Sequence, residues 1–305
     1  MKFVRFETRR GRSAWGWLDS ADPTLVREPV GPIATQSLQV HLTDGMEALL
    51  AQAAAADTLG HELAALRLLA PVPTPSKFIA VGRNYRAHAA ESGSQVPEEP
   101  MLFGIMPSAV NDPYGDVVLP TQSDQIDWEG ELAIVIGKRA RGVKQAQALD
   151  CIAGYTVIND FSARDLQRRD GQWSRAKSFD TFKPMGPCLT SVDELGLAED
   201  LHLSVKVNGK QKQDARTSLM VFPVAVLIEY ISAFCTLQPG DIIATGTPAG
   251  VGQGENPKSF LKAGDVVVTE IEGIGRMVNR IVPSGTSVAA NPAAETEKEV
   301  GLARA

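Results

Sequence analysis

Short runs of strand-forming residues, separated by glycine and proline, fill most of this chain between residues 77 and 282. These runs are Phe78–Val81, Val117–Leu119, Leu132–Ile136, Tyr155–Ile158, Leu203–Asn208, Asp241–Thr245 and Val266–Ile271. Helical patterns are fewer, and the clearest covers Pro223–Phe234. Strands that follow one another with few helices between them do not build the alternating βαβ units of a parallel sheet. The sequence therefore predicts an α+β fold that is mainly β, arranged as a mixed β-sandwich or barrel.

The first seventy residues follow a different pattern. Strands are expected at Met1–Glu7 and Ser13–Leu18, and a run rich in Ala and Leu predicts a helix near Asp44–Leu69. The segment Pro71–Pro75 then carries proline at alternate positions, and each proline fixes φ and removes a backbone donor. We therefore expect a small N-terminal α+β module over residues 1–70.

Two further segments follow this boundary. The strand-rich part is expected to form one larger domain over residues 71–283. The last stretch, residues 284–305, is polar, rich in Ala and Glu, and without strand or turn signals. This composition predicts a mobile tail.

Composition and charge restrict the class of protein. The chain has 305 residues, of which 44% are hydrophobic and 22% charged, as in ordinary soluble globular proteins. A net charge of -6 disfavours general binding to nucleic acids or anionic membranes. No apolar stretch approaches a membrane span, and the N-terminus lacks the apolar centre of a signal peptide, so we expect a cytoplasmic protein. Cys151, Cys188 and Cys235 are few and widely spaced, so we expect small buried thiols rather than disulfides or a zinc site.

Three carboxylates lie at the ends of two predicted strands. Glu129 and Glu131 are two residues apart, so their side chains project from the same face of a strand, and Asp160 ends the strand that begins near Tyr155. Like charges that converge must protonate or find a counter-ion. Oxygen ligands without nearby Cys or His favour Mg²⁺, Mn²⁺ or Ca²⁺ over zinc. The three acids therefore predict a metal site.

The competing interpretation is an exposed face of an edge strand, where acidic residues are common. The residues that follow argue against it. Leu132, Ile134 and Ile136 make one face apolar, while Ala133 and Val135 continue the other face without charge. Such a strand is expected to be buried on both sides, and acids that enter a buried strand need a partner.

His88 and Glu91 are three residues apart in a short helical pattern, which brings their side chains to the same side of a helix. A carboxylate beside an imidazole orients it and stabilises its charged form, so the pair is a candidate general base that takes a proton from water. A casual contact on a surface helix is the alternative interpretation.

Three more polar residues are candidates for contacts with a substrate. Lys177 could neutralise an enolate or carboxylate oxygen near the metal site, although a surface lysine is the alternative. Arg164 and Gln167 follow Asp160 closely enough for a turn or short helix to bring them back towards the metal. The planar fork of arginine suits a substrate carboxylate.

The glycine-rich segment Gly246–Gly254 lacks the spacing of either a dinucleotide-binding loop or a phosphate-binding P-loop. Glycines such as Gly246 let backbone amides approach a ligand closely, and Thr247 adds a hydroxyl group. The segment is therefore a candidate anion-binding loop, and a plain turn is the alternative.

With these residues assembled, the chain resembles the fumarylacetoacetate hydrolase family over most of residues 77–282. The first seventy residues are similar to the small N-terminal module of its bacterial two-domain members. The elements that carry the resemblance are Gly82–Glu91, Asp127–Glu131, Asn159–Asp165, Ala176–Phe179 and Pro239–Gly252. The resemblance implies a mixed β-sandwich roll as the catalytic domain and a homodimer.

The resemblance also implies roles for the candidate residues. Glu129, Glu131 and Asp160 would bind Mg²⁺ or Mn²⁺, with Lys177 beside the metal. His88 and Glu91 would activate water, and Arg164, Gln167 and the loop that contains Thr247 would contact the substrate. The chain departs from the family at Ile105, where relatives often carry a lysine. We therefore expect less positive charge near the mouth of the pocket.

Together these patterns predict a metal-dependent hydrolase that cleaves a carbon–carbon bond in 2,4-dioxo acids of the acylpyruvate type, giving a 2-oxo acid and a carboxylic acid. The same site could support decarboxylation of oxaloacetate, or isomerisation or hydration of 2-oxo-enedioic acids. A non-catalytic metal-binding or ligand-binding protein is an alternative of another class. It would not need His88, Glu91 and Lys177 together.

Overall fold

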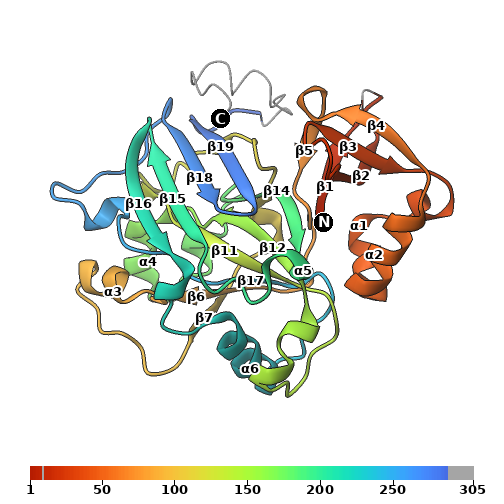
Figure 1. Cartoon of the computed structure of the whole chain (residues 1–305). Coiled ribbons are helices and arrows are strands. Elements are labelled where there is room, and N and C mark those ends of the chain that lie inside the picture. Colours follow the sequence, from red (N-terminus) through yellow and green to blue (C-terminus); the bar gives the residue numbers. More distant parts are fainter. Residues whose placement is uncertain (9, 288–305) are drawn as a thin grey trace.

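The computed structural model describes residues 1–8 and 10–287, which form a mainly β structure with helices at its periphery (Figure 1). The large sheet runs in the order β4-β3-β2-β1-β14-β12-β11-β17-β6-β7, with β5 beside β1 and β8 beside β14. The strands are β1 Lys2–Glu7, β2 Ser13–Leu18, β3 Leu25–Pro29, β4 Thr58–Glu62, β5 Arg67–Leu69, β6 Phe78–Gly82, β7 Met101–Gly104, β8 Val110–Asn111, β11 Gly130–Ile136, β12 Ile152–Asn159, β14 Lys183–Ser191 and β17 Ile242–Ala244. β6 lies parallel to β17, whereas β11 and β12 are antiparallel, so the sheet is mixed.

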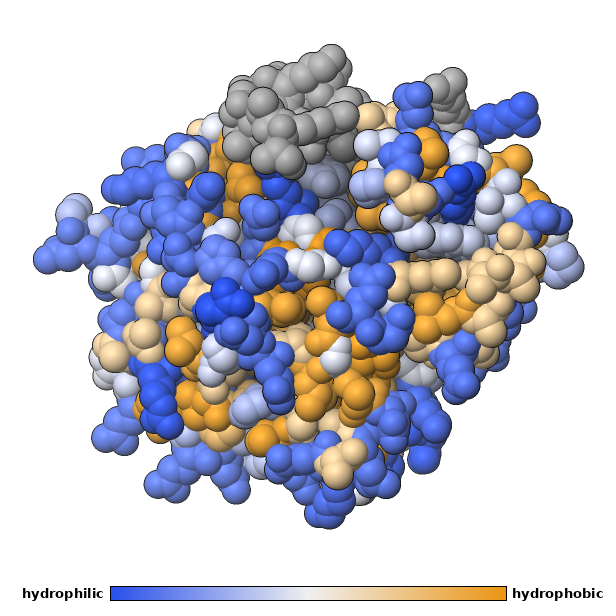
Figure 2. Space-filling view, in the orientation of Figure 1, coloured by the Kyte–Doolittle hydropathy of each residue, from blue (hydrophilic) through white to orange (hydrophobic). Residues whose placement is uncertain are grey.

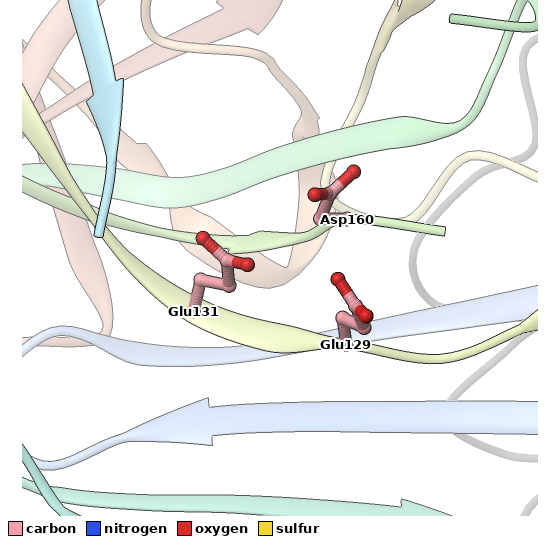
Figure 3. A group of neighbouring side chains, drawn as sticks. All are labelled: Glu129, Glu131 and Asp160. Atoms are coloured by element: carbon pink, nitrogen blue, oxygen red, sulfur yellow. The ribbon is translucent and has the colours of Figure 1, made fainter. Parts of the chain in front are cut away.

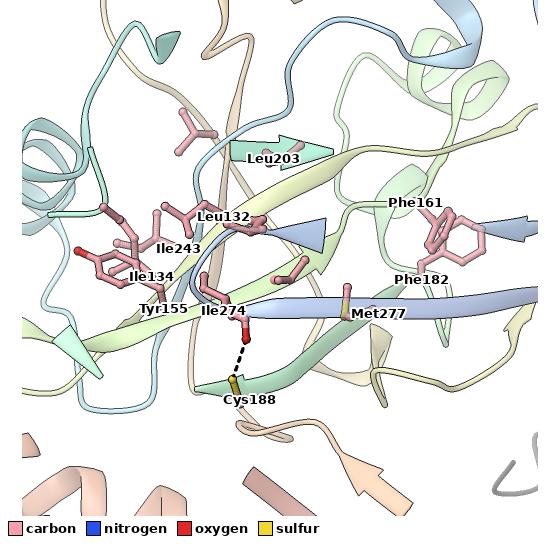
Figure 4. Close-up of a cluster of buried hydrophobic side chains, with 14 of the residues drawn as sticks. Leu132, Ile134, Tyr155, Phe161, Phe182, Cys188, Leu203, Ile243, Ile274 and Met277 are labelled. Carbon is pink, nitrogen blue, oxygen red and sulfur yellow. Dashed lines mark hydrogen bonds between the residues drawn. The ribbon is translucent and has the colours of Figure 1, made fainter. Parts of the chain in front are cut away.

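A second sheet, in the order β16-β15-β18-β19-β9, packs across β11 and β12. Its strands are β9 Val117–Val118, β15 His202–Val207, β16 Lys210–Arg216, β18 Val266–Ile271 and β19 Gly275–Val282, and the short strands β10 Ile126–Asp127 and β13 Ser162–Ala163 pair separately. Leu203 of the second sheet and Leu132 and Ile134 of the first belong to one buried cluster (Figure 4). Two sheets with an apolar core between them form a β-sandwich, which confirms the predicted fold class.

Helices are short and few in the described part of the chain. They are α1 Leu38–His41, α2 Met46–Ala55, α3 Arg86–Glu91, α4 Arg164–Asp170, α5 Val192–Leu195 and α6 Val224–Phe234, with 3₁₀ turns at Pro32–Thr35, Leu42–Asp44, Leu63–Ala65, Pro107–Ala109, Gln145–Gln147, Leu149–Cys151, Arg175–Lys177, Thr217–Leu219 and Gly252–Gly254. The predicted helix at Pro223–Phe234 is confirmed as α6, with Pro223 as its N-cap. No described helix is long and apolar enough to cross a membrane.

The helix expected near Asp44–Leu69 is wrong in its second half. Helix α2 ends at Ala55, and Ala56 is extended, with φ -79° and ψ 141°. The residues after it form β4, which pairs with β3, and β5, which pairs with β1. Gly60 is a poor helix former, and strand pairing supplies the backbone hydrogen bonds that a helix would have made.

The three longest strands that the sequence patterns missed are β14, β16 and β19. β14 contains Pro184 and Pro187, which hide a strand pattern, although it lies beside β12 in the large sheet. β16 is rich in Lys and Gln because it is the edge of the second sheet, where charged side chains oppose pairing with other chains. Figure 2 shows hydrophilic side chains on the side of the molecule that carries β16. β19 is the third.

The N-terminal residues share the large sheet with the rest of the chain. Strand β1 pairs with β14, with Phe3 opposite Leu189, so the module that ends near residue 70 is joined to the larger part by backbone hydrogen bonds. The boundary after residue 70 remains a prediction. Of the predicted tail, residues 288–305 lie outside the described residues. Cys151 and Cys188 are buried free thiols and Cys235 is half-buried.

Candidate metal centre and its cavity

The three candidate metal ligands come together where β11 begins and β12 ends. These strands are antiparallel, with Gly130 opposite Asn159, so Glu129, Glu131 and Asp160 meet at one edge of the pair (Figure 3). A ligand oxygen from each lies within 4.8 Å of the others. The backbone N–H of Asp160 donates to the carbonyl oxygen of Glu129 at 2.7 Å, which fixes the two strand ends together. The convergence predicted from their spacing is confirmed.

These acids are buried. Glu129, Glu131 and Asp160 are 3%, 2% and 0% exposed, and β11 is buried along its whole length between β12 and β17. The alternative of an exposed edge strand is therefore wrong. Burying ionised carboxylates is costly unless cations or hydrogen bonds compensate them.

Lys177 compensates two of the acids. Its ammonium lies 2.5 Å from Glu129 Oε2 and 2.7 Å from Asp160 Oδ2. Burial opposes the charge of Lys177, but Asp160 and Glu129 outweigh it and raise its pKa. Lys177 is only 2% exposed, so the alternative of a surface lysine is also wrong.

Glu131 has no cation partner among the described residues. Its Oε2 accepts a hydrogen bond of 2.7 Å from the backbone N–H of Gly246. Burial, together with the charges of Asp160 and Glu129, raises its pKa well above the usual range. A divalent cation held by the three carboxylates would supply the missing positive charge, so this oxygen-only donor set fits Mg²⁺, Mn²⁺ or Ca²⁺.

Arg164 contacts three side chains of the protein. Its Nε donates to Asp127 Oδ2 at 2.8 Å, its Nη2 lies 2.6 Å from Glu129 Oε1, and its Nη1 donates to Gln167 Oε1 at 3.1 Å. Burial alone would raise the pKa of Glu129, but Arg164, Lys177 and then His88 lower it to about 2. The guanidinium thus holds the candidate metal ligand Glu129 and Gln167 in place. Arg164 and Gln167 also line the cavity described below, so their contact with a substrate stays a prediction.

His88 and Glu91 form the expected pair in α3. His88 Nδ1 lies 2.7 Å from Glu91 Oε1, and Glu91 Oε2 accepts from the backbone N–H of Gly250 at 2.9 Å. In the neutral form of the imidazole, a hydrogen on Nδ1 that is donated to Glu91 would leave the Nε2 atom with its lone pair. His88 lines the same cavity as Glu129 and Glu131, so it can act there as a base.

The glycine-rich loop binds acids of the protein itself. Besides the contacts of Gly246 and Gly250, the backbone N–H of Gly252 donates to Asp127 Oδ1 at 2.6 Å. Gly246 has φ +98°, and an added Cβ would lie 2.8 Å from Asn84 Cβ, so only glycine suits this position. Thr247 Oγ1 donates to the carbonyl oxygen of Gly130 at 3.0 Å and lines the cavity. Neither a plain turn nor a free anion site describes the loop, because its amides donate to carboxylates of the candidate site.

These side chains line one cavity of about 570 Å³. Its inner wall contains Glu129, Glu131, Lys177 and Thr247, which are buried. Its outer wall is more accessible and contains Arg83, Arg168, Trp173, Gln253 and Lys258. Ile105 is not among the lining residues. It is 4% exposed and packs in the apolar core, and the expected loss of positive charge relative to other members of the family stays a prediction.

Sequence reasoning missed several residues of this site. Lys183 of β14 is completely buried, lies 2.8 Å from Asp160 Oδ1, and donates to the carbonyl oxygens of Phe161 and Phe182 at 3.0 and 3.1 Å. Burial lowers its pKa to about 8. No signal near Lys183 marks it, because its partner comes from the neighbouring strand. Asp127, by contrast, lies in the segment Asp127–Glu131, which the sequence already marks, so its pairing with an arginine could have been predicted.

Residues 77–282 match the family described as fumarylacetoacetate (FAA) hydrolase C-terminal. The human oxaloacetate tautomerase FAHD2B, mitochondrial, is 47% identical over 216 residues, which cover 70% of this chain and 69% of that protein. The structure of 2-hydroxyhepta-2,4-diene-1,7-dioate isomerase from Mycobacterium marinum is 38% identical, with a TM-score of 0.75, over 94% of this chain and 100% of that one.

A fumarylacetoacetate hydrolase from Exiguobacterium antarcticum is similar over 93% of this chain and 99% of its own, with 36% identity and a TM-score of 0.81. The relatives named here are enzymes, and two of them are named for tautomerisation or isomerisation rather than hydrolysis. The matched region contains the three carboxylates, Lys177 and the His88–Glu91 pair. On this agreement of sequence and fold, the chain belongs to the fumarylacetoacetate hydrolase family.

Proposed function

We propose that this protein is a metal-dependent enzyme that interconverts the keto and enol forms of a 2-oxo acid. The observation that carries the proposal is one cavity lined by a buried carboxylate cluster, a buried lysine and a histidine paired with a carboxylate. The names of the relatives, oxaloacetate tautomerase and dienedioate isomerase, support it because both reactions move a proton between carbon and oxygen or between two carbons. The sequence patterns put carbon–carbon hydrolysis first, whereas this proposal puts tautomerisation first and hydrolysis second.

Glu129, Glu131 and Asp160 would hold the metal ion, for which Mg²⁺ and Mn²⁺ are the first candidates and Ca²⁺ a third. When bound, such an ion supplies Lewis-acid polarisation of the substrate's 2-oxo group. The loop amide of Gly246 keeps Glu131 in position for this task.

The protein's own residues would carry the proton and the charge. The free Nε2 atom of His88 takes the proton from carbon 3 of the 2-oxo acid, and Glu91 stabilises the imidazolium that forms. The electron pair of that carbon–hydrogen bond moves towards the 2-oxo oxygen. The ammonium of Lys177, buried beside Glu129 and Asp160, stabilises the negative charge that develops there. Proton return to the oxygen completes the tautomerisation.

Hydrolysis of a 2,4-dioxo acid is the second candidate, and the His88–Glu91 pair favours it. Here His88 would take a proton from water, and the hydroxide would add to the 4-carbonyl carbon. Collapse of the adduct breaks the bond between carbons 3 and 4 and releases a carboxylic acid. The electron pair remains on the three-carbon fragment, which takes up a proton to give pyruvate. Decarboxylation of oxaloacetate would need Lys177 but no attacking water.

Product analysis tests these alternatives. The protein is incubated with Mg²⁺ or Mn²⁺ and either enol-oxaloacetate or an acylpyruvate. We expect faster loss of the enol absorbance of oxaloacetate without loss of mass, relative to metal alone. Pyruvate with a carboxylic acid would favour the hydrolase, and pyruvate with carbon dioxide would favour the decarboxylase. Absence of turnover for every substrate would instead support a non-catalytic metal-binding or ligand-binding protein.

Two further expectations remain proposals. The family resemblance suggests a homodimer, and the composition of the chain suggests a cytoplasmic location, whereas the human relative is named as mitochondrial. Sedimentation of the purified protein and localisation of a tagged copy would test them.

A further inference from the structure

Two cations in the outer wall of the cavity have no carboxylate partner among the described residues. In the inner wall, Lys177 and Arg164 are occupied by buried carboxylates. Arg83 and Lys258 line the same cavity, and within residues 1–8 and 10–287 neither forms an ion pair with a carboxylate. The outer wall therefore has positive charge available for an anionic group of a ligand.

Arg83 is held in an orientation defined by its surroundings. Its guanidinium lies 5.7 Å from the centre of the Trp173 ring, and Trp173 packs edge-on against Phe103 at 5.3 Å. The backbone of Arg83 is left-handed, with φ 57°, a conformation that non-glycine residues adopt mainly where the surrounding structure imposes it. Stacking on an aromatic face leaves the N–H groups at the edge of the guanidinium free to donate to an anion.

The two walls differ in depth. Glu129 and Glu131 of the inner wall are 3% and 2% exposed, whereas Arg83 is half-buried and Lys258 is exposed. A substrate whose 2-oxo acid end reaches the buried carboxylates would direct its other end towards these outer cations. A carboxylate there would pair with Arg83 bidentately and with Lys258 through a more mobile contact.

We propose that Arg83, supported by Lys258, forms a subsite for a second carboxylate at the far end of a 2-oxo acid substrate. This inference rests on the proposed function, which assigns the 2-oxo acid end to the inner wall. Arg83 and Lys258 are then specificity-determining residues. They select a diacid over an acid with a neutral end, and they take no part in the proton transfer.

The test measures binding without turnover. Malate and lactate are 2-hydroxy acids that differ at the far end, where malate carries a second carboxylate. Calorimetric titrations in Mg²⁺ compare the wild type with Arg83→Gln and with the matched control Arg86→Gln, which removes an exposed charge that does not line the cavity. We expect wild-type protein to bind malate about ten-fold to one-hundred-fold more tightly than lactate, as a charged hydrogen-bonded pair provides.

Arg83→Gln should lose most of this preference, and Arg86→Gln should keep it. Lys258→Gln should reduce the preference by a smaller factor, while Lys262→Gln, which removes an exposed charge outside the cavity, should not. Failure of the wild type to prefer malate, failure to bind malate, or an equal loss in Arg83→Gln and Arg86→Gln would overturn the inference. If the wild type prefers malate to lactate but turns over no substrate, the diacid site is supported and the proposed reaction is contradicted. Turnover without a preference for malate would support the proposed reaction and overturn the diacid site.

Discussion

The two walls of the cavity satisfy their charges in different ways. In the inner wall, Glu129 and Asp160 share Lys177, and both oxygens of each acid contact a cation. In the outer wall, Arg83 stacks on Trp173 and meets no described carboxylate. The difference teaches that the inner wall is arranged by the protein's own charges, as the proposed reaction centre requires, whereas the outer wall has charge left for a ligand.

Removing one inner carboxylate should have the largest effect. In Glu131→Gln the metal site loses one of its three charged ligands, so we expect a fall in activity of roughly a thousand-fold, since a metal ion contributes several kcal/mol to such reactions. Titration with Mn²⁺ should show weakened metal binding. A chelator should reduce wild-type activity similarly, and Mg²⁺ should restore it. Unchanged metal affinity in Glu131→Gln would exclude this residue as a ligand.

Replacing the proposed base should reduce the rate but spare the metal. For His88→Ala we expect a loss of about a hundred-fold to ten-thousand-fold in kcat, the usual contribution of general acid–base catalysis. Affinity for Mn²⁺ should stay near the wild-type value. Glu91→Gln, which keeps a hydrogen-bonding partner for the imidazole, should cost less. Full activity in His88→Ala would remove the histidine from the mechanism.

Lys183 offers a test of how the inner wall tolerates lost charge. Lys183→Met leaves Asp160 Oδ1 without its cation, and breaking a buried pair in this way costs about 3 to 5 kcal/mol of unfolding free energy. Saturating Mg²⁺ should recover part of the loss, because the metal would neutralise Asp160. Urea unfolding with and without Mg²⁺ measures both values. An equal loss in the two conditions would argue that the metal and Lys183 do not share Asp160.

Disturbing the outer wall should have the smallest effect. Trp173→Leu removes the ring on which Arg83 stacks, and such a contact contributes about 0.5 to 2 kcal/mol. We therefore expect a several-fold rise in KM for a dicarboxylic substrate with kcat nearly unchanged. Steady-state kinetics measures the two separately. A large fall in kcat would show that the outer wall also shapes the reaction centre.

Much of the site could be predicted because its signals are local. Glu129 and Glu131 share a face since successive side chains of a strand alternate, and His88 and Glu91 meet since residues three apart on a helix are neighbours. The β-rich pattern likewise predicted the sandwich. Local patterns failed where pairing overruled propensity, as in β4, or where prolines hid a strand, as in β14.

The sequence by itself determined which acids could converge, that His88 pairs with Glu91, and that the fold is mainly β. The tertiary structure decided what those acids contact. It placed Lys183 against Asp160, occupied Arg164 with Asp127 and Glu129, and brought Arg83 to the cavity while Ile105 entered the core. The physical reason is that spacing along one strand or helix fixes the direction of a side chain, whereas its partner depends on the register between strands distant in sequence.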